Sequence, residues 1–346
     1  MKKNNTLRNS LPGLGLVVAS MLPAVLNSAS SVGRSGEPPP TPVAATVKKV
    51  APSEKGVKEF SIAVSNLTDW AATVEVALEG VRVVGRSNVH AMDADCEIHF
   101  GAHASSFQGE PDGLVLEPMN ACIQPFQGQS EQKNLDWTKF GDQIKGVSIT
   151  AAGVPRIWPE HLVGGGDSNP DHAVELHPLT SVVSGGQTFN FAENVFAGEF
   201  HGGVKEPTAI DILRQTTVSV TKNGDFAEIS FKAGTIGNFT VLDIVIDPNK
   251  ISSDGAGSFR IDGAVMLDDS TSFPVRIVTV RGSPVNDEMQ KIQSRRRRKP
   301  VTMSALVLFS LSPESLLQAA NKSNGTNAVA VVRPIQLILY GPSDSE

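Results

Sequence analysis

Cysteine is scarce in this chain: only Cys96 and Cys122 occur among its 346 residues. Two thiolates without histidines cannot complete the four ligands of a structural zinc site, so metal binding through sulfur is the weaker interpretation. The two residues could instead form a disulfide, which would stabilise the fold by about 3 kcal/mol because it restricts the unfolded chain. Two separate buried thiols are the alternative.

Positive charge is not in excess either. The formal net charge is −6 and the pI is about 5.7, so the surface has no general attraction for phosphate backbones, and nucleic acid is an unexpected partner. The one basic run, "SRRRRKP" at residues 294–300, is expected to be a solvated loop. A site for an anionic polymer and a protease-sensitive tip are the alternatives. Its core is Arg295, Arg296, Arg297 and Arg298.

Two catalytic signatures are missing from the sequence. No G-x-S-x-G pattern occurs between a strand and a helix, which argues against serine hydrolase chemistry, and no H-E-x-x-H helix motif is present. The glycine-rich stretch "HLVGGGDSNPDH" at residues 161–172 joins two expected strands and opens no helix. It therefore lacks the helix dipole that a phosphate loop uses and is expected to be a hairpin tip.

Long apolar runs are confined to the N-terminus. The basic "MKKNNTLRNS" followed by a mostly apolar stretch of small residues is typical of a secretory signal peptide over residues 1–30. A retained anchor is the alternative, and it would be the chain's one contact with a membrane. Residues 31–58, rich in proline and glycine, are expected to be a flexible linker. Export to the periplasm or the extracellular space follows, a setting in which a disulfide can persist.

The remaining composition favours β structure, with 40% hydrophobic residues, 31 glycines and 22 prolines. Between residues 59 and 183 we expect three strands, a helix within residues 130–143 that begins after a Ser130 cap and stops at Gly141, and two more strands. The first strand is long and bends at Gly80. This β-β-β-α-β-β order is that of an OB-like five-stranded barrel.

Residues 184–346 have a different texture. Short alternating segments separated by Gly, Asn, Asp and Ser predict a β-sandwich-like second domain. "SPESLLQAAN" predicts one short helix capped by Ser312, with Pro313 in its first turn. The chain as a whole is therefore expected to be all-β, with two domains after the leader and the linker.

Histidine, the residue best suited to bind metals or move protons near neutral pH, is concentrated in one region. All seven histidines fall between residues 90 and 201, which directs attention to the first domain. They are His90, His99, His103, His161, His172, His177 and His201.

Strand parity selects a subset of polar residues. If Val174 and Leu176 point into the barrel, Glu175 and His177 point outward, whereas His172 falls on the core face or in the preceding turn. The same rule applied to the second and third strands yields an outward patch on three neighbouring strands. The patch comprises Glu97, His99, Glu117, Glu175 and His177. A solvated or hydrogen-bonded barrel surface is the favoured interpretation, and a site for Zn²⁺ or a similar divalent ion is the alternative.

A resemblance to other sequences supports the prediction of an OB-like first domain. "RIWPEH", a polar loop and "DHAVELHPLTSV" resemble an acid-His pair followed by a W-E-I-H-P-V-type strand in uncharacterised, exported bacterial proteins with an OB-like domain. The matching positions are Glu160, His161, Glu175, His177 and Pro178. The resemblance implies an OB-like fold and carries no established activity.

Three functions are compatible with these features, one of which is a structural surface component whose second domain supplies lateral contacts. The favoured one is a non-enzymatic exported protein that binds a ligand or a protein partner. The alternative is a metal-assisted hydrolase of phosphoester type that uses His161, Glu175 and His177 with help from Glu97 or His99, in which the metal lowers the pKa of a bound water. The binding protein and the hydrolase differ in whether these groups converge in a concave site.

Overall fold

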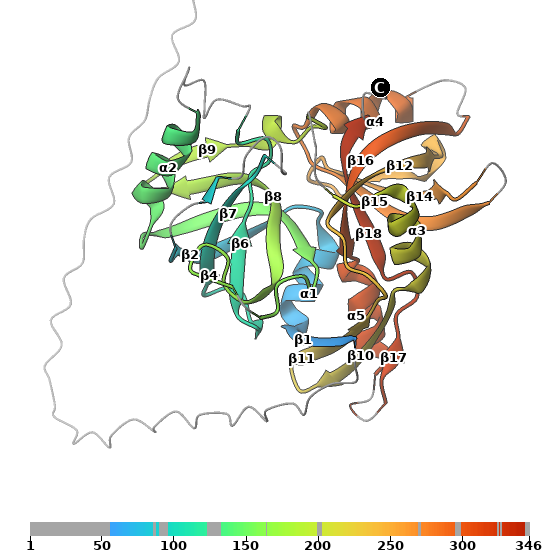
Figure 1. Cartoon of the computed structure of the whole chain (residues 1–346), viewed down its shortest axis with the longest axis horizontal. Coiled ribbons are helices and arrows are strands. Elements are labelled where there is room, and N and C mark those ends of the chain that lie inside the picture. Colours follow the sequence, from blue (N-terminus) through green and yellow to red (C-terminus); the bar gives the residue numbers. More distant parts are fainter. Residues whose placement is uncertain are drawn as a thin grey trace, which may run out of the picture. The chain divides into compact units, whose positions relative to one another are not determined.

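A computed structural model of the chain describes residues 56–85, 88–89, 96–122, 133–163, 165–198, 203–268, 271–294, 299–323, 325 and 327–342. The expected signal peptide, nearly all of the expected linker, His90, His201 and the Arg295 to Arg298 run lie outside the described residues. The described chain is mostly β and contains two closed five-stranded barrels (Figure 1).

The first barrel has the strand order expected of an OB fold. Neighbouring strands follow the order β2-β4-β6-β8-β7, and pairing of β7 with β2 closes the barrel. The third and fifth strands, β6 and β8, are parallel, and helix α2 (Lys133–Ile144) lies between β6 and β7 in the chain. The five strands are β2 (Val76–Val83), β4 (Ile98–Ala104), β6 (Gly113–Leu116), β7 (Ser148–Ile157) and β8 (His172–Ser184).

The bend expected at Gly80 is present. Gly80 has φ +63°, and the pairing of β2 with β7 shifts register between Leu78 and Val81. A side chain is disfavoured at this φ, so glycine permits the bulge. The bend allows β2 to pair with β7 along its length and with β4 at its far end.

Helix α2 does not stop at Gly141, as the sequence suggested, but continues to Ile144. Trp137, Phe140 and Ile144 are buried, and Trp137 and Phe140 pack against Phe100 of β4. Burying large apolar side chains at this helical spacing outweighs the cost of about 1 kcal/mol for a glycine inside a helix.

The second β domain also closes into a barrel rather than leaving two stacked sheets. Its order β12-β16-β18-β15-β14 is completed by pairing of β12 with β14, and its third and fifth strands, β15 and β18, are again parallel. Alternation within each strand is the same in a sandwich and a barrel, so the sequence pattern does not distinguish them. The strands are β12 (Phe239–Ile246), β14 (Phe259–Met266), β15 (Ser272–Thr279), β16 (Val301–Leu311) and β18 (Ile335–Pro342).

Both barrels therefore share one topology, with a helix between the third and fourth strands. In the second barrel this helix is α4 (Pro284–Ser294). The helix expected after Ser312 is confirmed as α5 (Pro313–Lys322), and the Ser312 side chain accepts a hydrogen bond from the Ser315 backbone.

A third sheet joins segments from both sides of residue 184. Its order is β17-β10-β11-β1-β5, and β1 pairs with β11 along its whole length. Residue 184 is thus not a boundary between sheets, and Val50–Glu346 form one compact unit. The strands are β1 (Val57–Ala63), β5 (Gly109–Glu110), β10 (Thr217–Asn223), β11 (Phe226–Lys232) and β17 (Val329–Ala330).

The shorter elements complete the described fold. The α-helices not expected from the sequence include α1 (Val64–Ala72) and α3 (Glu206–Gln215). The other elements are β3 (Asn88–Val89), β9 (Gln187–Asn190), η2 (Ala192–Asn194), η3 (Pro248–Lys250) and β13 (Ile251–Ser253).

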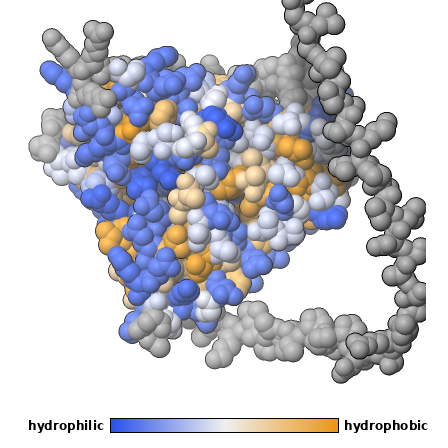
Figure 2. Space-filling model, turned by 180° about the vertical axis from the view of Figure 1, so that it is seen from behind, coloured by the Kyte–Doolittle hydropathy of each residue, from blue (hydrophilic) through white to orange (hydrophobic). Residues whose placement is uncertain are grey.

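The second barrel covers part of the outer face of the first. Arg156 Nε donates to the Phe309 carbonyl at 3.0 Å, and Trp158 Nε1 donates to the Gly237 carbonyl at 2.9 Å. An apolar cluster accompanies these bonds and includes Val74, Met119, Val154, Phe239, Leu308, Ile338 and Tyr340. Elsewhere, on the face in Figure 2, hydrophobic residues form small groups among hydrophilic ones.

The glycine-rich loop is packed onto the first barrel rather than standing away from it. A Cβ added at Gly101 of β4 would lie 2.1 Å from the Asp167 carbonyl oxygen, and one at Gly113 of β6 would lie 2.3 Å from the Asp171 carbonyl oxygen. Glycine therefore permits the loop backbone to approach two neighbouring strands.

We expect Gly101→Ala to lower the free energy of unfolding by about 1–3 kcal/mol, because the new methyl group overlaps loop backbone that has no flexible end to move aside. Urea denaturation measures the change. Gly166→Ala in the same loop is the matched control, since a Cβ there meets nothing within 4 Å. Equal stabilities of the two variants would contradict this close packing.

Candidate functional site

Three neighbouring strands of the first barrel bring the predicted polar patch together. Glu97 directly precedes β4 and His99 lies on it, Glu117 directly follows β6, and Glu175 and His177 lie on β8. The backbone of Glu117 is tied to β8 twice, because its N–H donates to Leu176 and its carbonyl accepts from Leu179. The side chains therefore meet on one face.

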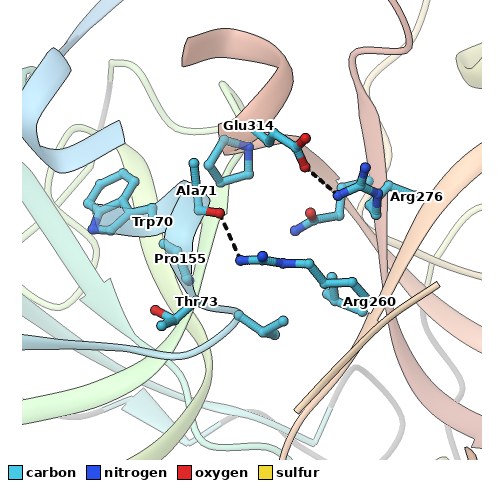
Figure 3. Close-up of a pocket in the computed structure, with 11 residues that line it drawn as sticks. Trp70, Ala71, Thr73, Pro155, Arg260, Arg276 and Glu314 are labelled. Carbon is cyan, nitrogen blue, oxygen red and sulfur yellow. Dashed lines mark hydrogen bonds and ion pairs between the residues drawn. The ribbon is translucent and has the colours of Figure 1, made fainter. Parts of the chain in front are cut away.

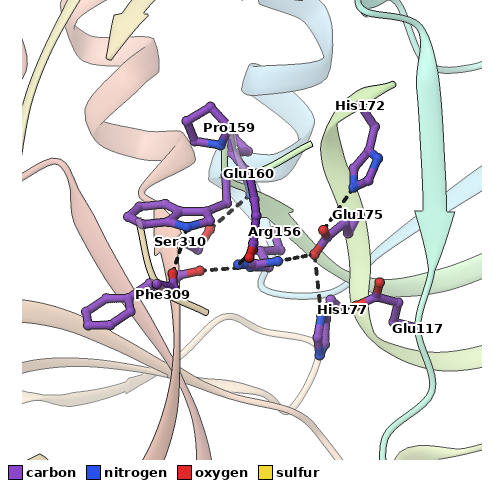
Figure 4. Close-up of polar contacts among 12 residues, drawn as sticks. Glu117, Arg156, Pro159, Glu160, His172, Glu175, His177, Phe309 and Ser310 are labelled. Atoms are coloured by element: carbon purple, nitrogen blue, oxygen red, sulfur yellow. Dashed lines mark hydrogen bonds and ion pairs between the residues drawn. The ribbon is translucent and has the colours of Figure 1, made fainter. Parts of the chain in front are cut away.

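His177 is the centre of this acid-imidazole cluster, which we define as Glu97, His99, Glu117, Glu175 and His177. Its Nε2 lies 2.7 Å from Glu97 Oε1 and its Nδ1 lies 2.5 Å from Glu117 Oε2. The other oxygen of Glu117 lies 2.9 Å from His99 Nε2. In Figure 4, His177 lies below Glu175 with Glu117 to one side, and Glu175 Oε2 lies 3.4 Å from His177 Nδ1.

An arginine closes the other side of the cluster. Arg156 on β7 places Nη1 2.5 Å from Glu175 Oε2 and Nη2 3.2 Å from Glu160 Oε2. Its Nε donates to the Phe309 carbonyl of the second barrel (Figure 4). The guanidinium is fully buried, and one planar fork thus serves two carboxylates and the barrel-barrel contact.

The patch is hydrogen-bonded, as the favoured interpretation allowed, but the structure shows that it is not solvated. Glu97 and His177 are 0% exposed, Glu175 is 2% exposed and Glu117 is 3% exposed. Parity placed these side chains on the outer face of the first barrel, but the second barrel covers that face. The rings of Phe239 and Tyr340 lie with their centroids 5.3 and 6.4 Å from that of His177.

The exclusion of His172 also needs correction. Its Nε2 lies 2.9 Å from Glu175 Oε1 and its Nδ1 lies 2.6 Å from the Pro170 carbonyl, so it extends the cluster. The ring of His161 stacks on that of His172, with centroids 5.3 Å apart. His161 thus adjoins the cluster through His172.

Sequence reasoning missed Arg156, Met119 and Tyr340. The signal for Arg156 was a charged residue inside the apolar run "VPRIW", which requires a buried acid as partner. Met119 Sδ lies 3.4 Å from His177 Nε2. Tyr340 comes from the last strand of the second barrel, and its buried hydroxyl has no hydrogen-bond partner among the described residues. No pattern in the sequence places it beside His177.

Burial and charge act in opposite directions on the pKa values of these groups. Burial alone would lower the pKa of His99, but the Glu117 carboxylate beside it raises that pKa to about 9. Burial would likewise lower the pKa of His177, yet Glu97 and Glu117 hold it well above its usual range. Burial raises the pKa of Glu175, and Arg156 more than offsets this, so the pKa lies well below its usual range.

The charges of the cluster and its arginine do not balance by themselves. With neutral histidines, the carboxylates of Glu97, Glu117 and Glu175 together with Arg156 carry a net charge of −2. Buried charge needs compensation. Either protons on the histidines or a divalent cation supplies it.

Two sets of three ligands have the spacing that a metal ion needs. Glu97, His99 and Glu117 form one set, and Glu117, Glu175 and His177 form the other. Within each set the ligand atoms lie within 4.8 Å of one another. Tetrahedral bonds of about 2.0–2.2 Å from carboxylate oxygen or imidazole nitrogen to Zn²⁺ separate the ligand atoms by about 3.3–3.6 Å, so atoms at the 4.8 Å limit would have to move closer by more than about 1 Å.

The disulfide between Cys96 and Cys122 is formed and borders the cluster. Cys96 directly precedes Glu97, and Cys122 lies five residues beyond Glu117. The bridge therefore ties the start of β4 to the segment after β6, which restrains the two strand ends that carry Glu97 and Glu117.

No family model, curated protein or solved structure matches the chain. None of the helices in the described ranges is long and apolar enough to span a bilayer. The chemistry of the acid-imidazole cluster is therefore the basis for a functional assignment.

Proposed function

We propose that this protein is an exported, non-enzymatic binding protein whose first barrel holds one divalent metal ion, Zn²⁺ or Mn²⁺, in the acid-imidazole cluster. The observation that carries the proposal is the convergence of buried carboxylate and imidazole ligand atoms within 4.8 Å of one another. One divalent cation offsets the buried negative charge while the histidines stay neutral, which is the form in which imidazole binds metals.

The surroundings of His177 support a metal ligand. When Nδ1 binds the ion together with Glu117 and Glu175, the Nε2–H points at Glu97 Oε1, 2.7 Å away. A carboxylate that orients a metal-bound histidine in this way is a recurrent arrangement. The buried Tyr340 hydroxyl, without a partner among the described residues, adds a polar group on the side of the second barrel.

Burial favours binding over hydrolysis. A catalytic metal keeps an open position for water and substrate. The cluster converges, but in the protein interior rather than in a concave surface site, and the side chain of His99, its most accessible member, is only 12% exposed. A closed site of this kind suits an ion that stabilises the fold and joins the two barrels.

Export is part of the same proposal. It is supported by the signal-peptide pattern of residues 1–30 and by the Cys96–Cys122 disulfide, a bond that persists mainly in oxidising compartments. Membership of the OB-like exported proteins that the β8 pattern resembles is proposed on the same grounds.

The test is metal binding by the purified mature protein. We expect metal analysis to find one equivalent of a divalent ion, and calorimetric titration of chelator-stripped protein to give one site for Zn²⁺ or Mn²⁺. Glu117→Gln, which changes the carboxylate common to both ligand sets, should weaken binding by at least about 100-fold, as should His177→Ala.

His103→Gln is the matched control. His103 lies 3.7 Å from Asp112 in an exposed imidazole-acid pair on the same barrel, so its loss should leave metal affinity unchanged. Absence of stoichiometric binding by the parent protein, or parental affinity in folded Glu117→Gln, would overturn the proposal.

A further inference from the structure

A second charged site lies beside the barrel-barrel contact, and its charge is opposite. Arg260 on β14 and Arg276 on β15 line one pocket together with Trp70, Pro155 and Gln336 (Figure 3). The space inside it that is open to the centre of a water molecule is only about 10 Å³, and the rest of the pocket is its open mouth. This is room for about one water, so one oxygen of a small group can enter while the remainder stays in the mouth.

Sheet register explains why the two arginines share this pocket. Arg260 pairs with Val278 and Asp262 pairs with Arg276 in the β14–β15 ladder, so the arginines are diagonal neighbours on the outer face of the second barrel. Arg276 in turn pairs with Gln336 on β18. The pocket thus lies on the second, third and fifth strands, the strands that carry the acid-imidazole cluster in the first barrel.

The two arginines differ in how their charge is matched. Arg276 contacts Glu314 at 2.6 Å and Asp262 at 3.3 Å. Arg260 donates to the Ala71 carbonyl at 2.9 Å, and no carboxylate of the described chain lies within ion-pair distance of it. Arg260 is therefore a half-buried cation beside a second cation, with most of its five donors available.

We infer that this pocket binds a small oxyanion, a carboxylate or a phosphate group, on the guanidinium of Arg260 with Arg276 beside it. A guanidinium fork matches the paired oxygens of either group. The ligand would reach the pocket through its open mouth, which the acid-imidazole cluster lacks. The site is independent of the proposed metal.

The test uses sodium phosphate and sodium acetate as probes, at constant ionic strength and with a chelator present so that bound metal does not contribute. Calorimetry measures binding, and the fluorescence of Trp70, whose side chain lines the pocket, reports it independently. We expect saturable binding of at least one probe to one site. The tighter probe identifies the natural ligand class as carboxylate or phosphate.

Variants assign the binding to the pocket. Arg260→Gln should weaken binding of the probe at least about ten-fold. Arg260→Lys keeps the charge but loses the fork, so its affinity should lie between those of the parent protein and Arg260→Gln. Arg82→Gln is the matched control, because Arg82 is also a strand arginine bonded to a carbonyl, that of Gly146. Parental affinity in Arg260→Gln, or no saturable binding of either probe, would overturn the inference.

Discussion

Replacing Arg156 by methionine should lower the free energy of unfolding of the metal-free protein by about 3–5 kcal/mol. Methionine fills much of the same volume, so the loss comes from charge rather than from a cavity. Glu175, which lies 2.5 Å from the guanidinium and is buried, would lose its strongest partner. The Phe309 carbonyl of the second barrel would lose its hydrogen bond at the same time.

Urea denaturation followed by circular dichroism measures this change. The double variant Arg156→Met with Glu175→Gln should recover part of the lost stability, because the uncompensated carboxylate is then gone. Arg276→Met is a comparison at a partly exposed pair, where about 1 kcal/mol or less is expected. A loss below about 1 kcal/mol for Arg156→Met would show that the Arg156–Glu175 pair is not a buried, coupled contact.

Raising the pH from 6.5 to 9 should destabilise the metal-free protein by about 3 kcal/mol through His99 alone. The folded-state pKa of His99 is about 9, above the ordinary histidine pKa of 6.5. A raised pKa means that the folded state holds the proton more tightly. The stabilisation is therefore complete below pH 6.5 and disappears as the pH rises through 9. His172 and His177, whose pKa values are also raised, act in the same direction.

The buried carboxylates change the stability with pH in the opposite direction to the histidines. The pKa values of Glu117 and Glu175 are lowered in the folded state, so their contribution is present above pH 4.5 and is lost as the pH falls below it. The metal-free protein should consequently be most stable between about pH 4.5 and 6.5.

Urea midpoints at pH 5.5, 6.5, 7.5 and 9 test this profile. His99→Gln should flatten the alkaline limb, whereas His103→Gln, outside the cluster, should leave it unchanged. Saturating metal should also reduce the alkaline loss, because neutral imidazole is the ligand form. Stability that is constant or rises between pH 6.5 and 9 in the stripped protein would contradict protonation of the buried histidines.

Local patterns in the sequence predicted the first barrel well. The order of strands and helix depends on alternation and turn residues, which are local properties, and the Gly80 bend required only that glycine accept a positive φ. The same patterns predicted α5 from its Ser312 cap. They could not predict that α2 would run past Gly141, because the burial of Ile144 depends on packing between distant segments.

The candidate site divides in the same way. Strand parity selected Glu97, Glu117, Glu175 and His177 as neighbours on one face, and the structure brings them together. Parity could not reveal that this face is buried, since a strand exposed to water and one covered by another domain alternate alike. His172 was excluded because parity placed it on the core face or in the preceding turn, although its ring contacts Glu175 in the structure.

The sequence by itself determined a β-rich chain, an OB-like first barrel, a pair of cysteines able to bond and a group of acids and histidines on adjoining strands, because each follows from local residue order. Only the tertiary structure decided that the second domain closes into a matching barrel and that its Phe239 and Tyr340 cover the cluster. It also decided that Arg156 lies between the two barrels. These features depend on contacts between residues up to about 160 positions apart, such as the 153 that separate Arg156 from Phe309, and on the burial of charge that such contacts enforce.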